Sequence, residues 1–107
     1  MKRLDCIKRD NLLVEFLIDN KGRENAVSKY IIADYLTDNG YPQSAGTVHA
    51  IIERLIQERH LPICSINRKG YYLAKTKADI LASIDELQSR ITAMQEHIEH
   101  LKNFIME

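Results

Sequence analysis

The apolar residues of this chain fall into blocks whose spacing predicts helices in its first sixty residues. Within each of three blocks, neighbouring apolar residues lie one, three or four positions apart, which is the spacing of a helix that buries one side. The blocks are Leu12, Leu13, Phe16 and Leu17; Ile31, Ile32, Tyr35 and Leu36; and Val48, Ile52, Leu55 and Ile56. We expect these side chains to meet in one core.

Polar residues and glycine at the ends of the blocks predict where the helices begin and end. Asp10, Ser28 and Ser44 are expected N-caps, because their side chains can accept a hydrogen bond from the first helical turn. Gly40 can adopt the left-handed conformation that often follows a helix, so it is expected to end the second one. Residues 39–43 then form a short turn between the second and third helices.

The chain after residue 60 changes from helical spacing to short apolar segments. Residues 61–66 and 71–74 are apolar and β-prone, and the turn-forming residues 67–70 separate them. This pattern predicts an antiparallel hairpin. We expect one of the neighbouring Tyr71 and Tyr72 side chains to be packed and the other exposed.

The order of these elements predicts a winged helix-turn-helix domain over residues 1–75. A helix, a short extended segment at residues 25–27, a helix, a turn, a helix and a hairpin follow one another, and the turn contains glycine. The fold class expected is therefore mainly α with a small β-hairpin. In such domains the second helix of the helix-turn-helix lies in the major groove of DNA.

Residues 76–107 have a heptad pattern that predicts one long coiled-coil helix. Apolar residues alternate at intervals of four and three with no member missing: Ile80, Ile84, Leu87, Ile91, Met94, Ile98, Leu101 and Ile105. Isoleucine at each a position, with residues that are not β-branched at most d positions, favours two parallel strands. The flanking pairs form no salt bridges, so charge does not choose between parallel and antiparallel pairing, and a larger bundle remains open.

The length of this helix indicates what its apolar side packs against. Thirty helical residues span about 45 Å, whereas a domain of 75 residues is only about 30 Å across. The far heptads therefore extend beyond the domain, and we expect them to pack against a second copy of the chain.

Charge is balanced over the whole chain and unbalanced between its two parts. The 107 residues include fifteen Lys and Arg and fifteen Asp and Glu. Residues 1–75 contain twelve basic and nine acidic residues, and residues 76–107 contain three basic and six acidic ones. This excludes a protein that is basic throughout, but it allows a basic domain on an acidic stalk to bind a polyanion.

Candidate DNA-binding residues lie on the third helix and around the hairpin. The start of that helix combines short hydrogen-bonding side chains with free backbone N–H groups, which suit phosphates and base edges. Arg54 suits guanine or phosphate, and the cations of the hairpin tip suit the DNA backbone or minor groove. The predicted DNA-binding residues are Lys29, Gln43, Ser44, Thr47, Arg54, Arg68, Lys69 and Lys75.

The hairpin sequence resembles that of a known group of proteins. Residues 61–65, LPICS, followed by residues 69–73, KGYYL, are similar to the hairpin of small winged-helix proteins encoded by phages and prophages. The start of the third helix, residues 44–48, and the heptad tail are also similar, so the resemblance covers residues 28–105. It implies a DNA-binding protein of replication or regulation, and it assigns no individual residue.

Other functional classes find little support in the sequence. The chain has no phosphate-binding glycine loop and no hydrolase or metalloprotease motif, so we expect neither an enzyme nor a bound cofactor or metal. No run of 18 apolar residues and no apolar leader is present, so we expect no membrane span. With two cysteines and no disulfide framework, the sequence predicts a cytoplasmic protein.

These observations predict a homodimeric winged-helix DNA-binding protein, from a phage or mobile element, that regulates transcription or replication. The alternative is an adaptor or inhibitor whose winged domain binds a protein partner and whose heptads join two copies. A third hypothesis is a component of DNA packaging or nucleoprotein assembly that uses a larger oligomer.

Overall fold

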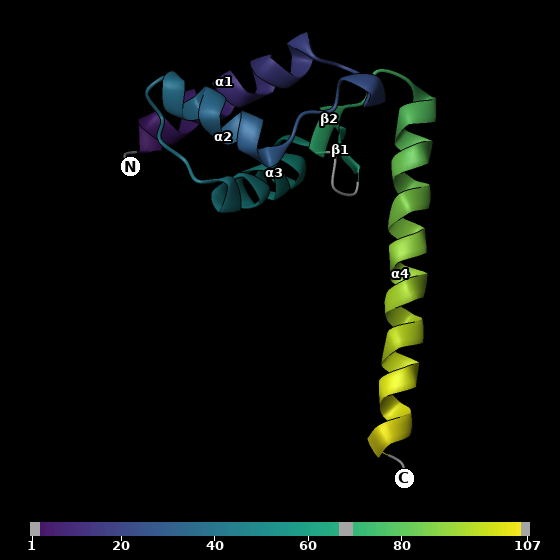
Figure 1. Cartoon of the computed structure of the whole chain (residues 1–107). Coiled ribbons are helices and arrows are strands. Elements are labelled where there is room, and N and C mark those ends of the chain that lie inside the picture. Colours follow the sequence, from purple (N-terminus) through teal and green to yellow (C-terminus); the bar gives the residue numbers. More distant parts are fainter. Residues whose placement is uncertain (1–2, 67–69, 106–107) are drawn as a thin grey trace.

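The computed structural model describes residues 3–66 and 70–105. The chain is mainly helical, with one antiparallel hairpin and a long C-terminal helix, which confirms the coarse fold class. The elements are α1 (Arg3–Asp19), the 3-10 turn η1 (Arg23–Asn25), α2 (Lys29–Asp38), α3 (Ala45–Arg59), β1 (Ile63–Ile66), β2 (Gly70–Leu73) and α4 (Lys77–Ile105). Figure 1 shows α1 to β2 gathered into a head, from one side of which α4 projects as a stalk.

The head encloses one apolar core between its three helices and the hairpin. Phe16 of α1 stacks on Tyr35 of α2, with ring centroids 4.3 Å apart. The core contains Leu13, Leu17, Ile32, Ala33, Leu36, Val48, Ile51, Ile52, Leu55, Ile63 and Leu73. The three predicted apolar blocks therefore meet as expected, with one exception in α2.

That exception is Ile31, which was expected to face the core but is 53% exposed. The buried side of α2 contains Ile32, Ala33 and Leu36. Residues 31 and 33 point in nearly opposite directions on a helix, because successive residues turn by about 100°. Once Ala33 packs inward, Ile31 must face solvent.

Of the three predicted N-caps, one is wrong, one is confirmed and one makes no capping hydrogen bond. α1 begins at Arg3, so Asp10 lies inside the helix and its assignment as an N-cap was wrong. Ser28 is confirmed, because its Oγ accepts a hydrogen bond from the Ile31 N–H at 3.2 Å. Ser44 occupies the N-cap position of α3, but its side chain makes no capping hydrogen bond.

The hairpin is antiparallel, as predicted, and a single residue extends it. Val27 forms an isolated bridge with Tyr71, and both N–H to carbonyl distances are 2.8 Å. Gly70 has a φ of +117°, and a Cβ on it would lie only 2.0 Å from the Val27 carbonyl oxygen. Glycine is therefore required where these backbones meet. Tyr72 is fully buried, while Tyr71 is half-buried rather than exposed.

The stalk is joined to the head mainly through polar contacts near its start. Tyr72 Oη donates to the Asp79 carbonyl oxygen at 3.1 Å. Arg23 pairs with Glu86 at 2.5 Å. Ser83 is the one residue of α4 that is buried within the described part of the chain. These contacts end at Glu86, about three turns into α4, and the molecule is elongated, with extents of 55 × 33 × 23 Å.

Candidate nucleic-acid interface

The N-terminal half of α3 presents small polar groups to solvent. Ser44, Thr47 and Ala50 are exposed, whereas Val48 on the opposite side of the helix is fully buried. A Cβ on Gly46 would have only Ser44 Oγ within 4 Å, at 3.8 Å. No packing within the described chain therefore requires glycine at this helical position. The surface is shallow and open to close approach.

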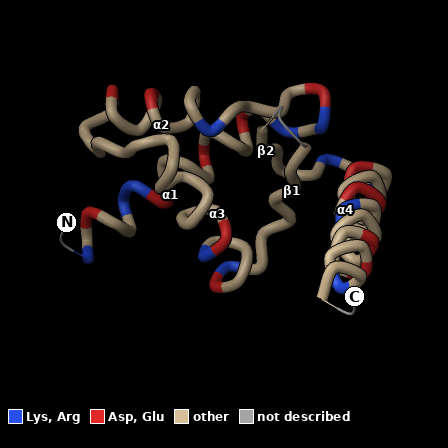
Figure 2. The backbone as a smooth tube through the Cα atoms, turned by 60° about the horizontal axis from the view of Figure 1, so that its bottom comes forward, with Lys and Arg blue, Asp and Glu red and all other residues tan. Residues whose placement is uncertain are grey.

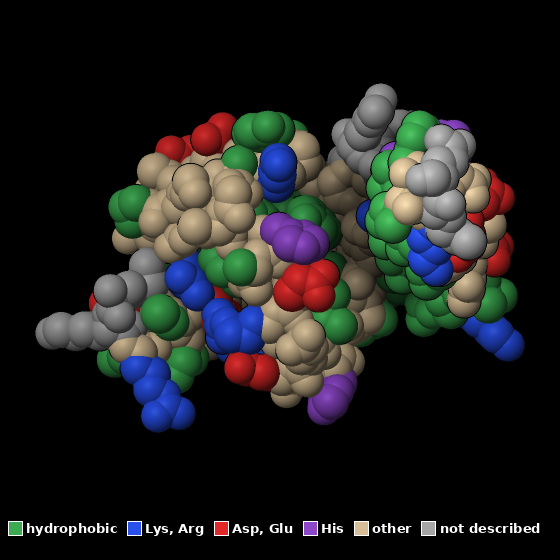
Figure 3. Space-filling view, turned by 90° about the horizontal axis from the view of Figure 1, so that it is seen from below, with side chains coloured by type: hydrophobic (Ala, Val, Ile, Leu, Met, Phe, Trp, Pro, Cys, Tyr) green, Lys and Arg blue, Asp and Glu red, His purple; other side chains and the backbone are tan. Residues whose placement is uncertain are grey.

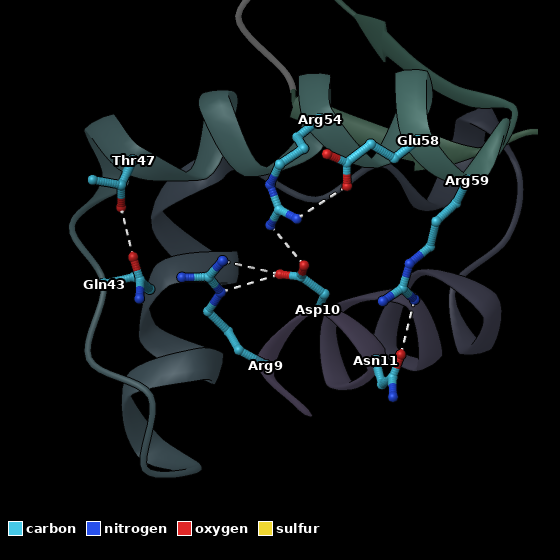
Figure 4. Close-up of polar contacts among 8 residues, drawn as sticks. All are labelled: Arg9, Asp10, Asn11, Gln43, Thr47, Arg54, Glu58 and Arg59. Carbon is cyan, nitrogen blue, oxygen red and sulfur yellow. Dashed lines mark hydrogen bonds and ion pairs between the residues drawn. The ribbon is translucent and has the colours of Figure 1, made fainter. Parts of the chain in front are cut away.

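Two of the predicted DNA-binding residues on this surface are already hydrogen-bonded to each other. Thr47 Oγ lies 3.0 Å from Gln43 Oε1 and 2.8 Å from the Ser44 carbonyl oxygen (Figure 4). The Gln43 backbone N–H donates to Thr37 Oγ at 3.3 Å. These contacts fix the turn against the start of α3. The Gln43 amide nitrogen can still donate outward.

The predicted basic residues of the wing are only partly brought together. Lys29 is exposed at the start of α2 and follows closely on Val27, the residue that pairs with β2. Lys75 lies five residues beyond Gly70, about 16 Å further along an extended chain. Lys75 therefore lies away from Lys29, beside the start of the stalk. Two further predicted DNA contacts, Arg68 and Lys69, lie outside the described residues.

Arg54, predicted to contact guanine or phosphate, is bound to a carboxylate of α1, and its side chain is 39% exposed. Its guanidinium donates to Asp10 Oδ2 at 2.6 Å and to Glu58 at 3.4 Å (Figure 4). The hydrogen bond to Asp10 raises the pKa of Arg54 further above its usual value. Arg9 donates to the other Asp10 oxygen at 3.1 Å. The Asp10 carboxylate, 2% exposed, therefore ties α1 to α3.

Sequence analysis missed this cluster, although one signal was present. Asp10, Leu13 and Leu17 share one side of α1, so a carboxylate occupies the apolar side of that helix. A charge in such a place needs a partner. The partner, Arg54, is 44 residues away in the chain, so no local pattern could have named it.

A second polar cluster lies between α3 and the hairpin. His49 Nδ1 is 2.8 Å from Tyr71 Oη, and His49 Nε2 is 3.8 Å from Glu53. Burial raises the pKa of Tyr71, so this phenol stays protonated and can donate to the imidazole. The contact links the exposed side of α3 to the strand that follows the hairpin tip.

Charged residues are mixed over the head and segregated on the stalk. Figure 2 shows basic and acidic residues interspersed along the head. On the projecting part of α4, Figure 3 shows hydrophobic side chains nearer the head and acidic ones on the far side, whereas Asp79 and Glu86 near its start contact the head region. The exposed side of α3 and the projecting stalk lie on the same side of the head (Figure 1). A polyanion bound to α3 would thus face the less acidic side of the stalk.

A groove of about 520 Å³ lies in the corner between α3, the hairpin and α4. Apolar walls come from Ile52, Ile56 and Ile63, and Leu87 of the stalk lines it too. We call this the corner groove. Its α4 wall consists of Ser83, Leu87 and Arg90.

The predicted dimerisation residues are not buried against the head. The side of α4 that faces the head includes Asp79, Ser83 and Glu86, which are polar. The heptad residues are exposed to the following extents: Ile80 39%, Ile84 45%, Leu87 47%, Ile91 57%, Met94 61%, Ile98 46%, Leu101 48% and Ile105 83%. We call this row the seam. Its pairing with a second chain stays a prediction.

Within residues 3–66 and 70–105, three or more His, Cys, Asp or Glu side chains nowhere gather as they would around a metal ion. None of the described helices is both long and apolar enough to cross a membrane. Comparisons with protein-family models, curated proteins and solved structures found no match, so the function must be argued from the residues alone.

Proposed function

We propose that the protein is a winged-helix DNA-binding protein that acts as a homodimer joined through α4. The observation that carries this proposal is the N-terminal half of α3, whose Ser44, Gly46 and Thr47 face solvent while the opposite side of the helix forms the core. Small residues permit a backbone to approach a groove closely, and hydroxyl groups bind phosphates or base edges. The resemblance to phage proteins suggests a role in transcription or replication.

In this proposal α3 enters the major groove and the hairpin lies on the adjoining backbone. The bridge between Val27 and Tyr71 supports it, because it fixes the hairpin beside the start of α2, where Lys29 is exposed. Lys29 and the tip residues Arg68 and Lys69 would then neutralise phosphates. Arg54 acts as a structural residue in this arrangement, since it already binds Asp10.

The second candidate is a protein-binding adaptor, and the charge distribution favours it. Three arginines of the head have partners inside it: Arg9 and Arg54 bind Asp10, and Arg59 donates to Asn11 at 2.8 Å. These three arginines are therefore less available to phosphate, while Lys8, Lys21, Lys29 and Lys75 are exposed. A protein partner would need shape and apolar contact more than positive charge.

Selection of bound sequences from random duplexes, at two salt concentrations, separates the two candidates. Binding to DNA predicts an enriched motif and a steep loss of affinity with salt, because phosphate contacts release counterions. The Lys29→Ala variant should weaken binding to all sequences alike, whereas Thr47→Ala should change the selected motif. Asp34→Ala, at an exposed site elsewhere on α2, is the control for Lys29→Ala. Absence of binding at low salt would reject the DNA proposal and favour the adaptor.

A further inference from the structure

We infer that the second copy pairs with the stalk in antiparallel orientation, and that its Phe104 occupies the corner groove. This inference rests on the self-association contained in the proposed function. It adds the direction of the partner helix and the residue that fills the groove.

The corner groove adjoins one particular flank of the seam. With isoleucine at the a positions, Ser83 and Arg90 are g positions and Leu87 is a d position. These three residues form the α4 wall of the groove. A helix packed on the seam would therefore place the residues that face g over this groove, whose head side combines Ile56 and Tyr71 with the polar Lys29, His49 and Glu53.

The two orientations bring different residues to that place. In a parallel pair, g faces e of the other chain, so Gln88 and Gln95 of the partner would face Ser83 and Arg90. Polar groups such as His49 and Glu53 line the groove, but amides placed there would leave the apolar surface of Ile56 and Leu87 without an apolar partner. Parallel pairing therefore suits this groove less well.

In an antiparallel pair, g faces g, and the full overlap of the seams places Phe104 of the partner beside Ser83. Phe104 is 67% exposed and, apart from an edge contact with its neighbour His100, projects into solvent. An aromatic ring suits a groove whose lining combines Ile56 and Leu87 with the aromatic rings of Tyr30 and Tyr71. The same overlap sets Ile84 opposite Leu101 and Ile80 opposite Ile105, so every seam residue has a partner. A shift of one heptad would leave either Leu101 and Ile105 or Ile80 and Ile84 uncovered, depending on its direction.

Disulfide formation between single cysteines tests the orientation in the full chain. The background is Cys6→Ser, which retains the buried Cys64. One chain has Ile84→Cys, and a second, lengthened by a tag, has Leu101→Cys. In the antiparallel pair these two positions are opposite each other, whereas two copies of residue 84 lie about 26 Å apart along the stalk. We therefore expect the mixture to form the mixed disulfide and neither chain alone to form a disulfide dimer.

The outcomes separate this inference from the proposed function. A rapid disulfide dimer of the Ile84→Cys chain alone would show parallel pairing and overturn the orientation, leaving self-association intact. Monomers by light scattering, with no disulfide in the mixture, would overturn the inference and the homodimer together. Gel shifts on the untagged chain report DNA binding independently of both results.

Substitution of the aromatic residue tests the occupant of the groove. Phe104→Ala should weaken dimerisation at least 10-fold, measured by sedimentation equilibrium, while Phe104→Leu should retain most of it. Asn103→Ala, at the neighbouring outward position, is the control and should leave the dimer unchanged. An unchanged dimer for Phe104→Ala would show that the ring does not fill the groove.

Discussion

The head and the stalk use the same kinds of apolar residue in opposite ways. Leu13, Ile32 and Leu55 of the head are completely buried. Ile91, Met94 and the rest of the seam are between 39% and 83% exposed. The head thus encloses a core of its own and leaves only separate apolar side chains such as Ile7, Ile18 and Ile31 exposed, whereas the described part of the stalk presents a continuous apolar row that its own chain does not cover.

This difference indicates that the two regions depend on concentration differently. The head buries its core within one chain, so its folding should not depend on protein concentration. Most of the stability of a helix in a protein comes from packing of its apolar side rather than from helix propensity. The far half of α4 should therefore be fully helical only when a second molecule covers the seam, and its helicity should fall on dilution.

The largest expected effect comes from placing charges in the seam. Ile91→Asp with Ile98→Asp puts carboxylates where the partner helix would bury them, and an unpaired buried charge is strongly unfavourable. We expect dimerisation to weaken by at least about 100-fold, or about 3 kcal/mol, with loss of α4 helicity and much weaker DNA binding. Light scattering and circular dichroism measure the first two effects.

Matched substitutions outside the seam show whether the loss of dimerisation comes from the position of the new charges or from the added charge itself. Ser89→Asp with Asn103→Asp adds the same two charges on the outward side of α4 and should leave the dimer intact. Dimers that persist in the seam variant would mean that the heptads are not the interface. The head should keep its cooperative unfolding in both variants.

A smaller effect is expected inside the head, from the carboxylate that ties α1 to α3. Asp10→Asn keeps the size of the side chain and removes the charge that binds Arg9 and Arg54. Breaking a buried ion pair costs about 3–5 kcal/mol, and the partial exposure of Arg54 reduces this to about 2–3 kcal/mol. Urea unfolding should show this loss without a change in the oligomeric state.

Two control variants show how much of the stability loss is specific to the buried Asp10 carboxylate. Glu58→Gln removes the exposed partner of Arg54 and should cost less than about 1 kcal/mol. Asp34→Asn changes an exposed carboxylate and should be nearly neutral. A loss for Asp10→Asn no larger than that for Glu58→Gln would show that the cluster contributes little to the head.

The stalk was more predictable from the sequence than the head. A single uninterrupted period defined α4, and the structure confirms one helix whose heptad residues share an uncovered side. In the head, spacing located the helices but could not decide between Ile31 and Ala33, since both neighbour Ile32. The role of Asp10 depends on Arg54, and the corner groove depends on three elements meeting, so neither has a local signature.

The joint between the two regions provides the smallest expected effect and a pH signature. Tyr72 of β2 donates to the Asp79 carbonyl of α4. Burial, together with the neighbouring Cys64 thiol, raises the pKa of Tyr72 to about 12. Because the folded state retains this proton above pH 10 and the unfolded state loses it, the free energy of unfolding should decrease between about pH 10 and pH 12.

Tyr72→Phe should remove both the hydrogen bond to the Asp79 carbonyl and the titrating phenol. At pH 7 it should cost about 1 kcal/mol, the usual net value of one hydrogen bond. Above pH 10 the natural chain should lose up to about 2 kcal/mol of stability that the variant does not lose. The free energies of unfolding of the two chains should therefore approach each other. Tyr30→Phe, at a side chain that is 64% exposed, is the control. If urea unfolding shows an equal alkaline loss for Tyr72→Phe and the natural chain, Tyr72 is not the titrating group, and the joint does not link head stability to pH.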